Sequence, residues 1–343
     1  MTFRLPAEWE PQSGLMLTWP HDKTDWANLL DEVEPVFTEI TRHVSQSQAV
    51  LIVCRDNEHK KHISGLLEKT NSSHYNCHYF LAASNDSWAR DHGPITILND
   101  GEPELLDFTF NGWGNKYPAN LDNLITSELY REHAFNEIPL KKLGFVMEGG
   151  SIETDGKGTL LTTSSCLLSP QRNPGLSRSE IEKKLQEYLH VQRIFWLNHG
   201  HLRGDDTDGH IDTLARFIDA ETILYIASND PLDPNYESLS LMEKELKSLK
   251  KINGMPYNLV PLPAIAIKNS DGQYLPASYA NFLITNDTVL VPVYDIGMDA
   301  AVMDIFKKCF VNRKIVAINC RTLVQQYGNL HCIAMHLPQG VVS

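Results

Sequence analysis

The sequence lacks the cysteine spacings that mark metal ribbons and redox motifs. Its six cysteines include no Cys-x-x-Cys pair, which argues against a zinc ribbon or a thioredoxin-type site. Six cysteines among 343 residues are also too sparse for a disulfide scaffold. We therefore expect reduced thiols in a cytoplasmic protein, and at most one or two of them should take part in chemistry.

Long hydrophobic runs are missing as well. The longest apolar runs, such as Ala49–Cys54, have the length of a strand and fall far below the roughly 20 residues of a membrane-spanning helix. The N-terminal segment has no apolar stretch typical of a secretory signal. No Pro-, Gly- or Ser-rich linker divides the chain. These absences predict no membrane partner and a single domain over residues 1–343.

Positive charge is scarce: 30 Lys and Arg stand against 43 Asp and Glu, a formal charge of −13. Such a field repels phosphate backbones over about a Debye length, so we expect no nucleic-acid partner. The same field would mildly concentrate cationic small molecules. A composition of 42% hydrophobic and 21% charged residues is globular, and it leaves a homo-oligomer open.

Short β-rich runs alternate with amphipathic stretches, although not strictly. Apolar residues recur near the 3.6-residue period within 26–45, which predicts a helix, and further helices are expected over 59–69, 179–190, 236–250 and 300–309. The helix over 179–190 would begin with Ser179 and Glu182, a capping-box pattern. Paired strands over 281–293 favour repeated ββαβ units or a mixed sheet over a doubly wound parallel sheet.

Polar or catalytic residue types cluster beside glycine at the ends of several predicted strands. These segments are 85–94, 148–151, 205–212, 278–281 and 327–332. Binding and catalytic residues are often carried by loops that a rigid scaffold positions. These segments therefore contain the candidate catalytic groups.

His210 and Asp212 stand two residues apart in one of them. On a strand, such residues point to the same face, and the carboxylate would favour a charged imidazolium, which suits a general acid. A solvated acidic loop is one alternative, although four aspartates within 205–212 are unusual for a loop. A metal site is another, but no His-Glu-x-x-His or similar ligand spacing is present. We therefore expect no metal.

Cys332 follows a short polar segment that contains Gly328. Because glycine lets the backbone approach a substrate closely, Cys332 is the candidate nucleophile. A buried structural cysteine is the alternative. Cys54, Cys309 and Cys320 lie in or beside apolar runs, which favours a structural role for them.

Asp91 precedes the turn-forming pair Gly93-Pro94 and lies at the end of an element, either as a turn cap or in a site. Trp88 is either a core residue or an aromatic wall for a cation. Two carboxylates can hold a planar guanidinium, whose central carbon a thiolate can attack. Because nearby acids raise a thiol pKa, we hypothesise that a bound cation helps to activate its own nucleophile.

At these motifs the sequence resembles the agmatine deiminase family of the guanidine-modifying (pentein) superfamily, which also contains bacterial peptidylarginine deiminases. The matching segments occur in the same order nearly from end to end of the chain. They are Leu-Pro-Ala-Glu-Trp-Glu-Pro from Leu5, Asn-Asp-Ser-Trp-Ala-Arg-Asp-His-Gly-Pro from Asn85, Glu-Gly-Gly-Ser-Ile from Glu148, Gly-His-Ile-Asp from Gly209 and Gly-Asn-Leu-His-Cys from Gly328.

The resemblance implies a fold and a reaction. The fold is a five-bladed α/β propeller of ββαβ units with pseudo-fivefold symmetry, about 69 residues per unit. The reaction is hydrolysis of agmatine to N-carbamoylputrescine and ammonia through a cysteine thiouronium, with no metal or organic cofactor, as a step toward putrescine. Cys332 would be the nucleophile, His210 the general acid and base, and Asp91 and Asp212 the guanidinium-binding pair.

The resemblance also implies further binding residues. Trp88 and Asp206 match positions that line the substrate pocket, and Gly149 and Asn281 stand in matched motifs. Two departures touch this pocket: Asp206 replaces the glutamate usual in agmatine-specific members, and Gln326-Tyr327 replaces glycines. Deimination of peptidyl or free arginine is therefore the first alternative. A non-catalytic pentein that acts as a binding protein is the second.

Overall fold

The computed structural model describes residues 2–70 and 76–343 and has a mixed α/β fold. Five of its sheets contain three or four strands. In each, one strand pairs antiparallel with one neighbour and parallel with another. Helices lie in the connections between the parallel strands, because such strands need a long crossover. The predicted mixture of strand pairings is confirmed.

Within each of the following five groups, neighbouring strands are hydrogen-bonded to each other. They are β1 (Phe3–Arg4), β5 (Ile95–Asn99), β6 (Glu102–Thr109) and β7 (Leu140–Val146); β10 (Arg193–Leu197), β9 (Thr159–Thr163) and β8 (Ile152–Thr154); β11 (Ala215–Asp219), β12 (Thr222–Ala227) and β13 (Asn258–Pro263); β16 (Leu283–Ile284), β17 (Thr288–Val293) and β18 (Lys314–Asn319); and β19 (Ala334–Pro338), β2 (Gln12–Thr18), β3 (Ala49–Cys54) and β4 (Cys77–Leu81). A separate pair joins β14 (Ile267–Lys268) to β15 (Tyr274–Leu275).

The helices fall into long ones and single turns. The longer helices are α1 (Leu30–Val44), α2 (Asn57–Lys69), α5 (Ile125–Arg131), α7 (Arg178–Leu189), α8 (Tyr236–Ser248) and α9 (Asp299–Cys309). The short ones are α3 (Ala89–His92), α4 (Gly112–Asn115) and α6 (Ser164–Leu167), with 3-10 turns η2 (Asp122–Leu124), η3 (Gly149–Ser151), η4 (Ile211–Thr213) and η5 (Leu323–Gln326).

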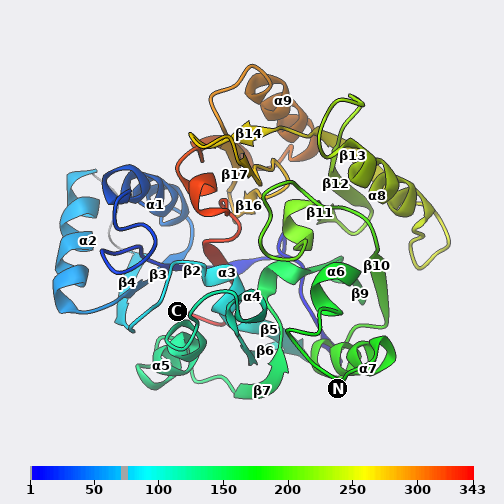
Figure 1. Ribbon diagram of the computed structural model, residues 1–343. Helices are drawn as coiled ribbons and strands as arrows, with labels where there is room; N and C mark the ends of the chain where they lie inside the picture. The colour runs from blue at the N-terminus through cyan, green and yellow to red at the C-terminus, as the bar shows by residue number, and fades with distance from the viewer. Residues whose placement is uncertain (1, 71–75) are drawn as a thin grey trace.

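The sheets surround the middle of the molecule, and the longer helices cover their outer sides (Figure 1). The short helices α3, α4 and α6 lie nearer to the middle. β19 pairs antiparallel with β2, with Ala334 opposite Leu17. The two ends of the chain therefore share one sheet, and this pairing brings the C-terminal loop 327–332 to the N-terminal segment.

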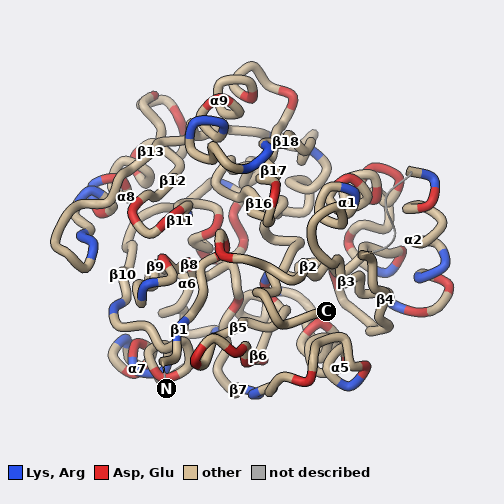
Figure 2. Tube along the Cα trace, turned by 180° about the vertical axis from the view of Figure 1, so that it is seen from behind, with Lys and Arg blue, Asp and Glu red and all other residues tan. Residues whose placement is uncertain are grey.

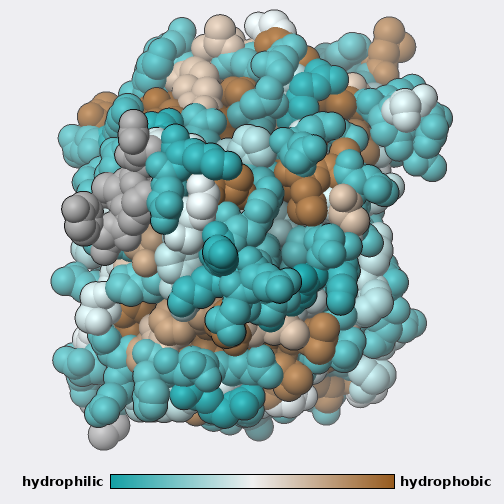
Figure 3. All heavy atoms as spheres, turned by 90° about the vertical axis from the view of Figure 1, so that its left-hand side faces the viewer, coloured by the Kyte–Doolittle hydropathy of each residue, from teal (hydrophilic) through white to brown (hydrophobic). Residues whose placement is uncertain are grey.

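Apolar faces account for these elements. All six residues of β3 are buried, as expected for a strand covered on both faces, and α1 buries Val33, Phe37, Ile40 and Val44 against it at helical spacing. Charge of both signs runs along the outer helices α2 and α8 (Figure 2). The face shown in Figure 3 is mostly hydrophilic. Within the described ranges, no helix has both the length and the apolar character needed to cross a membrane.

Most predicted helices are confirmed within a few residues, but one predicted helix start is wrong. The capping box of α7 is formed by Ser177 and Glu180, not by Ser179 and Glu182: the side chain of Ser177 accepts from the Glu180 N–H, and Glu180 reaches back to the Ser177 N–H at 2.8 Å. Both pairs fit the Ser-x-x-Glu pattern. The helix begins at the earlier one.

The cap gives a first prediction. Ser177→Ala should lower the free energy of unfolding by about 1 kcal/mol, because it removes the side-chain oxygen that accepts from the Glu180 N–H. Chemical denaturation measures the change. Ser179→Ala is the matched control, two residues further on inside the helix, and should be close to neutral. An equal loss in both variants would contradict the assigned cap.

Candidate active site

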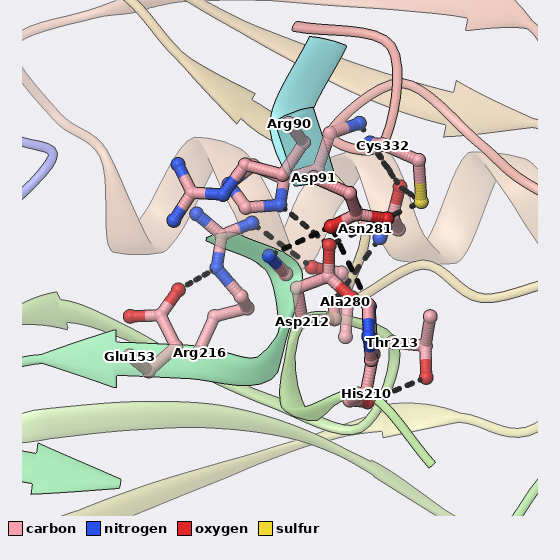
Figure 4. Close-up of polar contacts among 12 residues, drawn as sticks. Arg90, Asp91, Glu153, His210, Asp212, Thr213, Arg216, Ala280, Asn281 and Cys332 are labelled. Atoms are coloured by element: carbon pink, nitrogen blue, oxygen red, sulfur yellow. Dashed lines mark hydrogen bonds and ion pairs between the residues drawn. The ribbon is translucent and has the colours of Figure 1, made fainter. Parts of the chain in front are cut away.

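Cys332 lies in the loop between η5 and β19, and its thiol is fixed by one asparagine. Cys332 as a whole is 8% exposed to solvent. The Asn281 side-chain oxygen accepts from the backbone N–H groups of His331 and Cys332, at 2.9 and 3.3 Å, and lies 3.3 Å from Sγ. The Asn281 amide N–H in turn donates to the Asp212 carbonyl at 3.3 Å. Asn281 therefore ties the cysteine loop to the loop that carries Asp212 (Figure 4).

The thiol of Cys332 is neutral in the empty site. Burial raises its pKa well above the ordinary value, and the carboxyl groups of Asp212 and Asp91 act in the same direction. Sγ lies 4.0 Å from Asp212 Oδ2. The acids that would hold a cation thus oppose the thiolate, as the sequence hypothesis requires.

His210 is placed differently from the prediction. It does not lie on a strand with Asp212; it stands just before η4, and its Nδ1 lies 3.7 Å from Asp91 Oδ1. Burial lowers the pKa of His210 well below its ordinary value, and the charges of Arg172, Lys116 and Arg90 lower it further. The imidazole is therefore neutral, whereas the sequence predicted a charged ring.

Asp91, Asp212 and His210 converge on Gly150. A Cβ on Gly150 would lie 2.6 Å from His210 Nδ1, 2.9 Å from Asp91 Oδ1 and 3.0 Å from Asp212 Oδ2. Only glycine fits between these side chains, and its N–H donates to Asp91 Oδ1 at 2.9 Å. Gly149, the predicted glycine, instead packs on the backbone of Arg90. The glycine pair of the Glu-Gly-Gly-Ser motif thus packs behind and between the catalytic groups.

Two buried atoms of this cluster have no hydrogen-bond partner among the described residues. They are His210 Nε2 and Asp212 Oδ1. Buried polar atoms are normally paired, so these two are free to form hydrogen bonds with a bound group. Burial raises the pKa of Asp91 to about 7 and that of Asp212 well above its ordinary range. The arrangement offers hydrogen-bond acceptors to a cation.

A cavity of about 510 Å³ leads to Cys332. Trp88 forms part of its wall, packed against Trp26 with ring centroids 5.7 Å apart. Gly328 lies under this ring, where a Cβ would come within 2.0 Å of Trp88. The structure thus confirms that Trp88 faces a cavity and gives the close approach at Gly328 a steric reason.

The cavity also contains Asp206, whose Oδ2 accepts from the Tyr117 hydroxyl at 2.9 Å. Burial raises the pKa of Asp206 to about 6. Lys23 and Arg55 line the same cavity. Arg55 is held in ion pairs with Asp22 and Asp56. The cavity therefore presents groups of both signs.

Three functional neighbours are missed by the sequence prediction. Trp113 donates its indole N–H to Asp91 Oδ2 at 2.8 Å. Glu148 lies beside His210 and forms a buried ion pair with Arg172 at 2.9 Å. Glu148 is the first residue of the matched segment Glu-Gly-Gly-Ser-Ile, so the sequence did point to this position. Arg172 also stands in a segment that matches the family, 162–174, whereas Trp113 gave no signal, because its contact with Asp91 depends on the tertiary fold.

Two groups of side chains could offer ligands to a metal in the described part of the chain. One contains Glu148, Cys166 and His210; the other contains Glu8, His331 and His336. In each, the glutamate already forms an ion pair with a buried arginine. A fixed guanidinium supplies the positive charge that a metal would bring, so the chemistry of these groups does not fit a metal.

The comparisons with known proteins agree with this geometry. Residues 4–338 match the family model described as Porphyromonas-type peptidyl-arginine deiminase. The chain belongs to this family. The resemblance drawn from the motifs is thereby confirmed, and it extends over almost the whole described chain.

Several relatives of the family are solved or curated. A Porphyromonas gingivalis structure assigned as an arginine deiminase is 50% identical, with a TM-score of 0.94 and full coverage of both chains. A Campylobacter jejuni agmatine deiminase with substrate bound is 36% identical, with a TM-score of 0.91 over 99% of this chain and 97% of its own. A Vibrio parahaemolyticus protein assigned as an agmatine deiminase is 34% identical over 98% of this chain and 97% of its own.

The neutral thiol gives a second prediction. Alkylation of Cys332 by iodoacetamide should be slow at pH 7 and should rise with pH beyond pH 9, because burial holds the thiol pKa above its ordinary value. Mass spectrometry of the Cys332 peptide measures the rate. Glutathione in the same solution is the reference, with an inflection near the ordinary thiol pKa of about 8.5. A plateau for Cys332 below pH 8 would contradict the neutral thiol.

Proposed function

We propose that this protein is an agmatine deiminase, a hydrolase that acts on a C–N bond of a linear amidine and converts agmatine to N-carbamoylputrescine and ammonia. The observation that carries the proposal is the convergence of His210, Asp91 and Asp212 around Gly150, with the Cys332 thiol 4.0 Å from Asp212 Oδ2. Their unpaired atoms leave acceptors for a guanidinium group beside a thiol. The agmatine deiminases among the similar structures support the same chemistry.

We further propose that the fold is a five-bladed α/β propeller of ββαβ units, formed by one domain over residues 1–343. Five sheets with one shared pairing pattern support it. The pairing of β19 with β2 supports it as well, because it joins the last unit to the first. Six unpaired thiols in the described chain support a reducing compartment such as the cytoplasm.

The first step of the proposed reaction is binding of the positively charged guanidinium group. A guanidinium that binds between Asp91 and Asp212 favours the carboxylate form of both and lowers the pKa of the neighbouring thiol. The thiol proton passes to His210, and Sγ of Cys332 bonds to the central guanidinium carbon. Binding of the substrate thus creates the thiolate and imidazolium that the empty site does not contain.

The adduct then loses ammonia. His210 returns its proton to one nitrogen of the adduct, the C–N bond breaks, and a cationic thiouronium remains on Cys332. His210 next takes a proton from water, whose oxygen bonds to the same carbon. The hydroxyl of this second adduct loses its proton as the carbonyl forms and the C–S bond breaks, and that proton leaves on the released ammonia as ammonium. The thiolate of Cys332 takes back the proton held by His210, and the ureido product leaves. No redox step is needed.

The substrate assignment rests on the distal part of the cavity. Asp206 can face the far amine of agmatine, and Trp88 offers an aromatic wall to the same cation. Arginine is the second candidate, because Lys23 and Arg55 also line the cavity and could face a carboxylate. The ion pairs of Arg55 with Asp22 and Asp56 leave it less able to do so.

An ammonia-release assay tests the proposal. The purified chain should release ammonia from agmatine faster than from arginine or a blocked arginyl peptide, and a chelator should not change the rate. Cys332→Ser should abolish turnover while it still binds agmatine, because the hydroxyl is a poor nucleophile without a strong base. Inactivity on all three compounds would sink the deiminase proposal. Preference for arginine would replace the substrate.

Asp206 gives a separate prediction. Asp206→Asn should lower kcat/KM for agmatine about tenfold, which corresponds to about 1.4 kcal/mol of lost binding, and should leave butylguanidine, which has no distal amine, unchanged. Steady-state kinetics on both compounds measure the effect. Asp230→Asn, on an exposed loop, is the charge-matched control. Equal loss on both substrates would place Asp206 outside the amine subsite.

A further inference from the structure

His331 is completely buried between two carboxyl groups, and the mechanism above does not use it. Its Nδ1 lies 2.7 Å from Asp212 Oδ2, and its Nε2 lies 2.8 Å from Glu8 Oε1. It directly precedes Cys332 in the chain. The ring therefore joins a guanidinium-binding carboxyl to the N-terminal segment, immediately behind the nucleophile.

Glu8 is itself surrounded by cations. It forms ion pairs with Arg90 of α3, at 2.5 Å, and with Arg216 of β11. His336 of β19 approaches it at 3.4 Å, and Glu153 of β8 shares Arg216. These are the charged groups that face His331 from the neighbouring elements. Asp212, His331 and Glu8 thus form a hydrogen-bonded bridge. The two arginines that pair with Glu8 keep the Glu8 end of this bridge ionised.

The hydrogen count then fixes the proton positions. A neutral imidazole has one N–H, yet both ring nitrogens of His331 face a carboxyl oxygen. Arg216 and Arg90 lower the pKa of Glu8, and burial raises that of Asp212. In the empty site, the Nε2–H of His331 therefore donates to Glu8, and protonated Asp212 donates to Nδ1.

A guanidinium changes this arrangement. Asp212 Oδ1, which has no partner among the described residues, is the oxygen free to bind the cation, and a carboxylate binds it far better than an acid. The nearest acceptor for the Asp212 proton is Nδ1 of His331. We propose that His331 is a positioning residue that holds Asp212 Oδ2 and takes up its proton when a guanidinium binds at Oδ1.

The transfer is balanced within the bridge. The O–H bond of Asp212 breaks, an N–H bond forms on His331, and the imidazolium then lies between two carboxylates, Asp212 and Glu8. No proton leaves to solvent from this pair. The proposal rests on the proposed function, since it takes Asp212 as a guanidinium ligand.

Calorimetry of agmatine binding to Cys332→Ser, in buffers of different ionisation enthalpy, tests the transfer. His331→Asn in this background keeps a donor near Nδ1 but has no basic nitrogen, so binding should release one more proton than in Cys332→Ser alone. His331→Gln should lose the Asp212 contact instead. In the active chain, which retains Cys332, His331→Asn and His331→Gln should each raise KM about tenfold with a smaller change in kcat.

His336→Asn is the matched control. His336 also contacts Glu8 but not Asp212; its Nε2 bonds the Ile284 carbonyl at 2.9 Å. It should release the same number of protons as the parent. Nitrogen NMR of labelled histidine in Cys332→Ser tests the transfer with His331 itself in place. The Nδ1 of His331 should become protonated when agmatine binds.

The outcomes separate the two proposals. An unchanged proton count in His331→Asn, or an Nδ1 that stays unprotonated with agmatine bound, would overturn the role of His331 while ammonia release by the wild-type chain upheld the deiminase. Absence of both ammonia release and agmatine binding would overturn the proposed function, and the role of His331 with it.

Discussion

Desolvation of the groups around Gly150 sets the state of the empty site. Burial keeps the Cys332 thiol and the His210 imidazole neutral and raises the pKa of Asp91 and Asp212. Each of these groups becomes charged only when a charge of the opposite sign arrives. A single planar cation meets this condition for the thiol and for both carboxyl groups, and the proton that leaves the thiol would then charge His210. The site is therefore selective through charge balance, before any contact with the rest of the substrate is made.

The same constraint explains why the charges behind the site are fixed. Glu8, Arg90, Arg216 and Glu153 form buried ion pairs, and breaking such a pair by removing one partner is costly. Arg90 and Arg216 hold Glu8 ionised behind groups whose charge the proposed reaction would change, whereas burial raises the pKa of Glu153 to about 7. Similarly, Arg172 neutralises Glu148 beside His210. The protein therefore separates ionised structural groups from the titrating catalytic ones.

The sequence indicated which side chains gather at the candidate site better than it predicted the contacts among them. Cys332 was recognisable because a glycine-containing polar loop precedes it, and Asp91 because a Gly-Pro turn follows it. The prediction that His210 and Asp212 lie on one strand was wrong because the chain turns into η4 between them, and a local 3-10 turn leaves no clear period in the sequence. Ser179 failed as a cap because Ser177 offers the same pattern two residues earlier.

Contacts between distant residues could not be predicted from a local pattern. Glu8 and His331 are 323 positions apart, and they meet because β19 pairs with β2 and so completes the sheet that holds both ends of the chain. An N-terminal glutamate thus lies behind the C-terminal candidate nucleophile. Because the β19–β2 pairing brings these two segments together, the candidate site depends on a contact between residues from opposite ends of the chain.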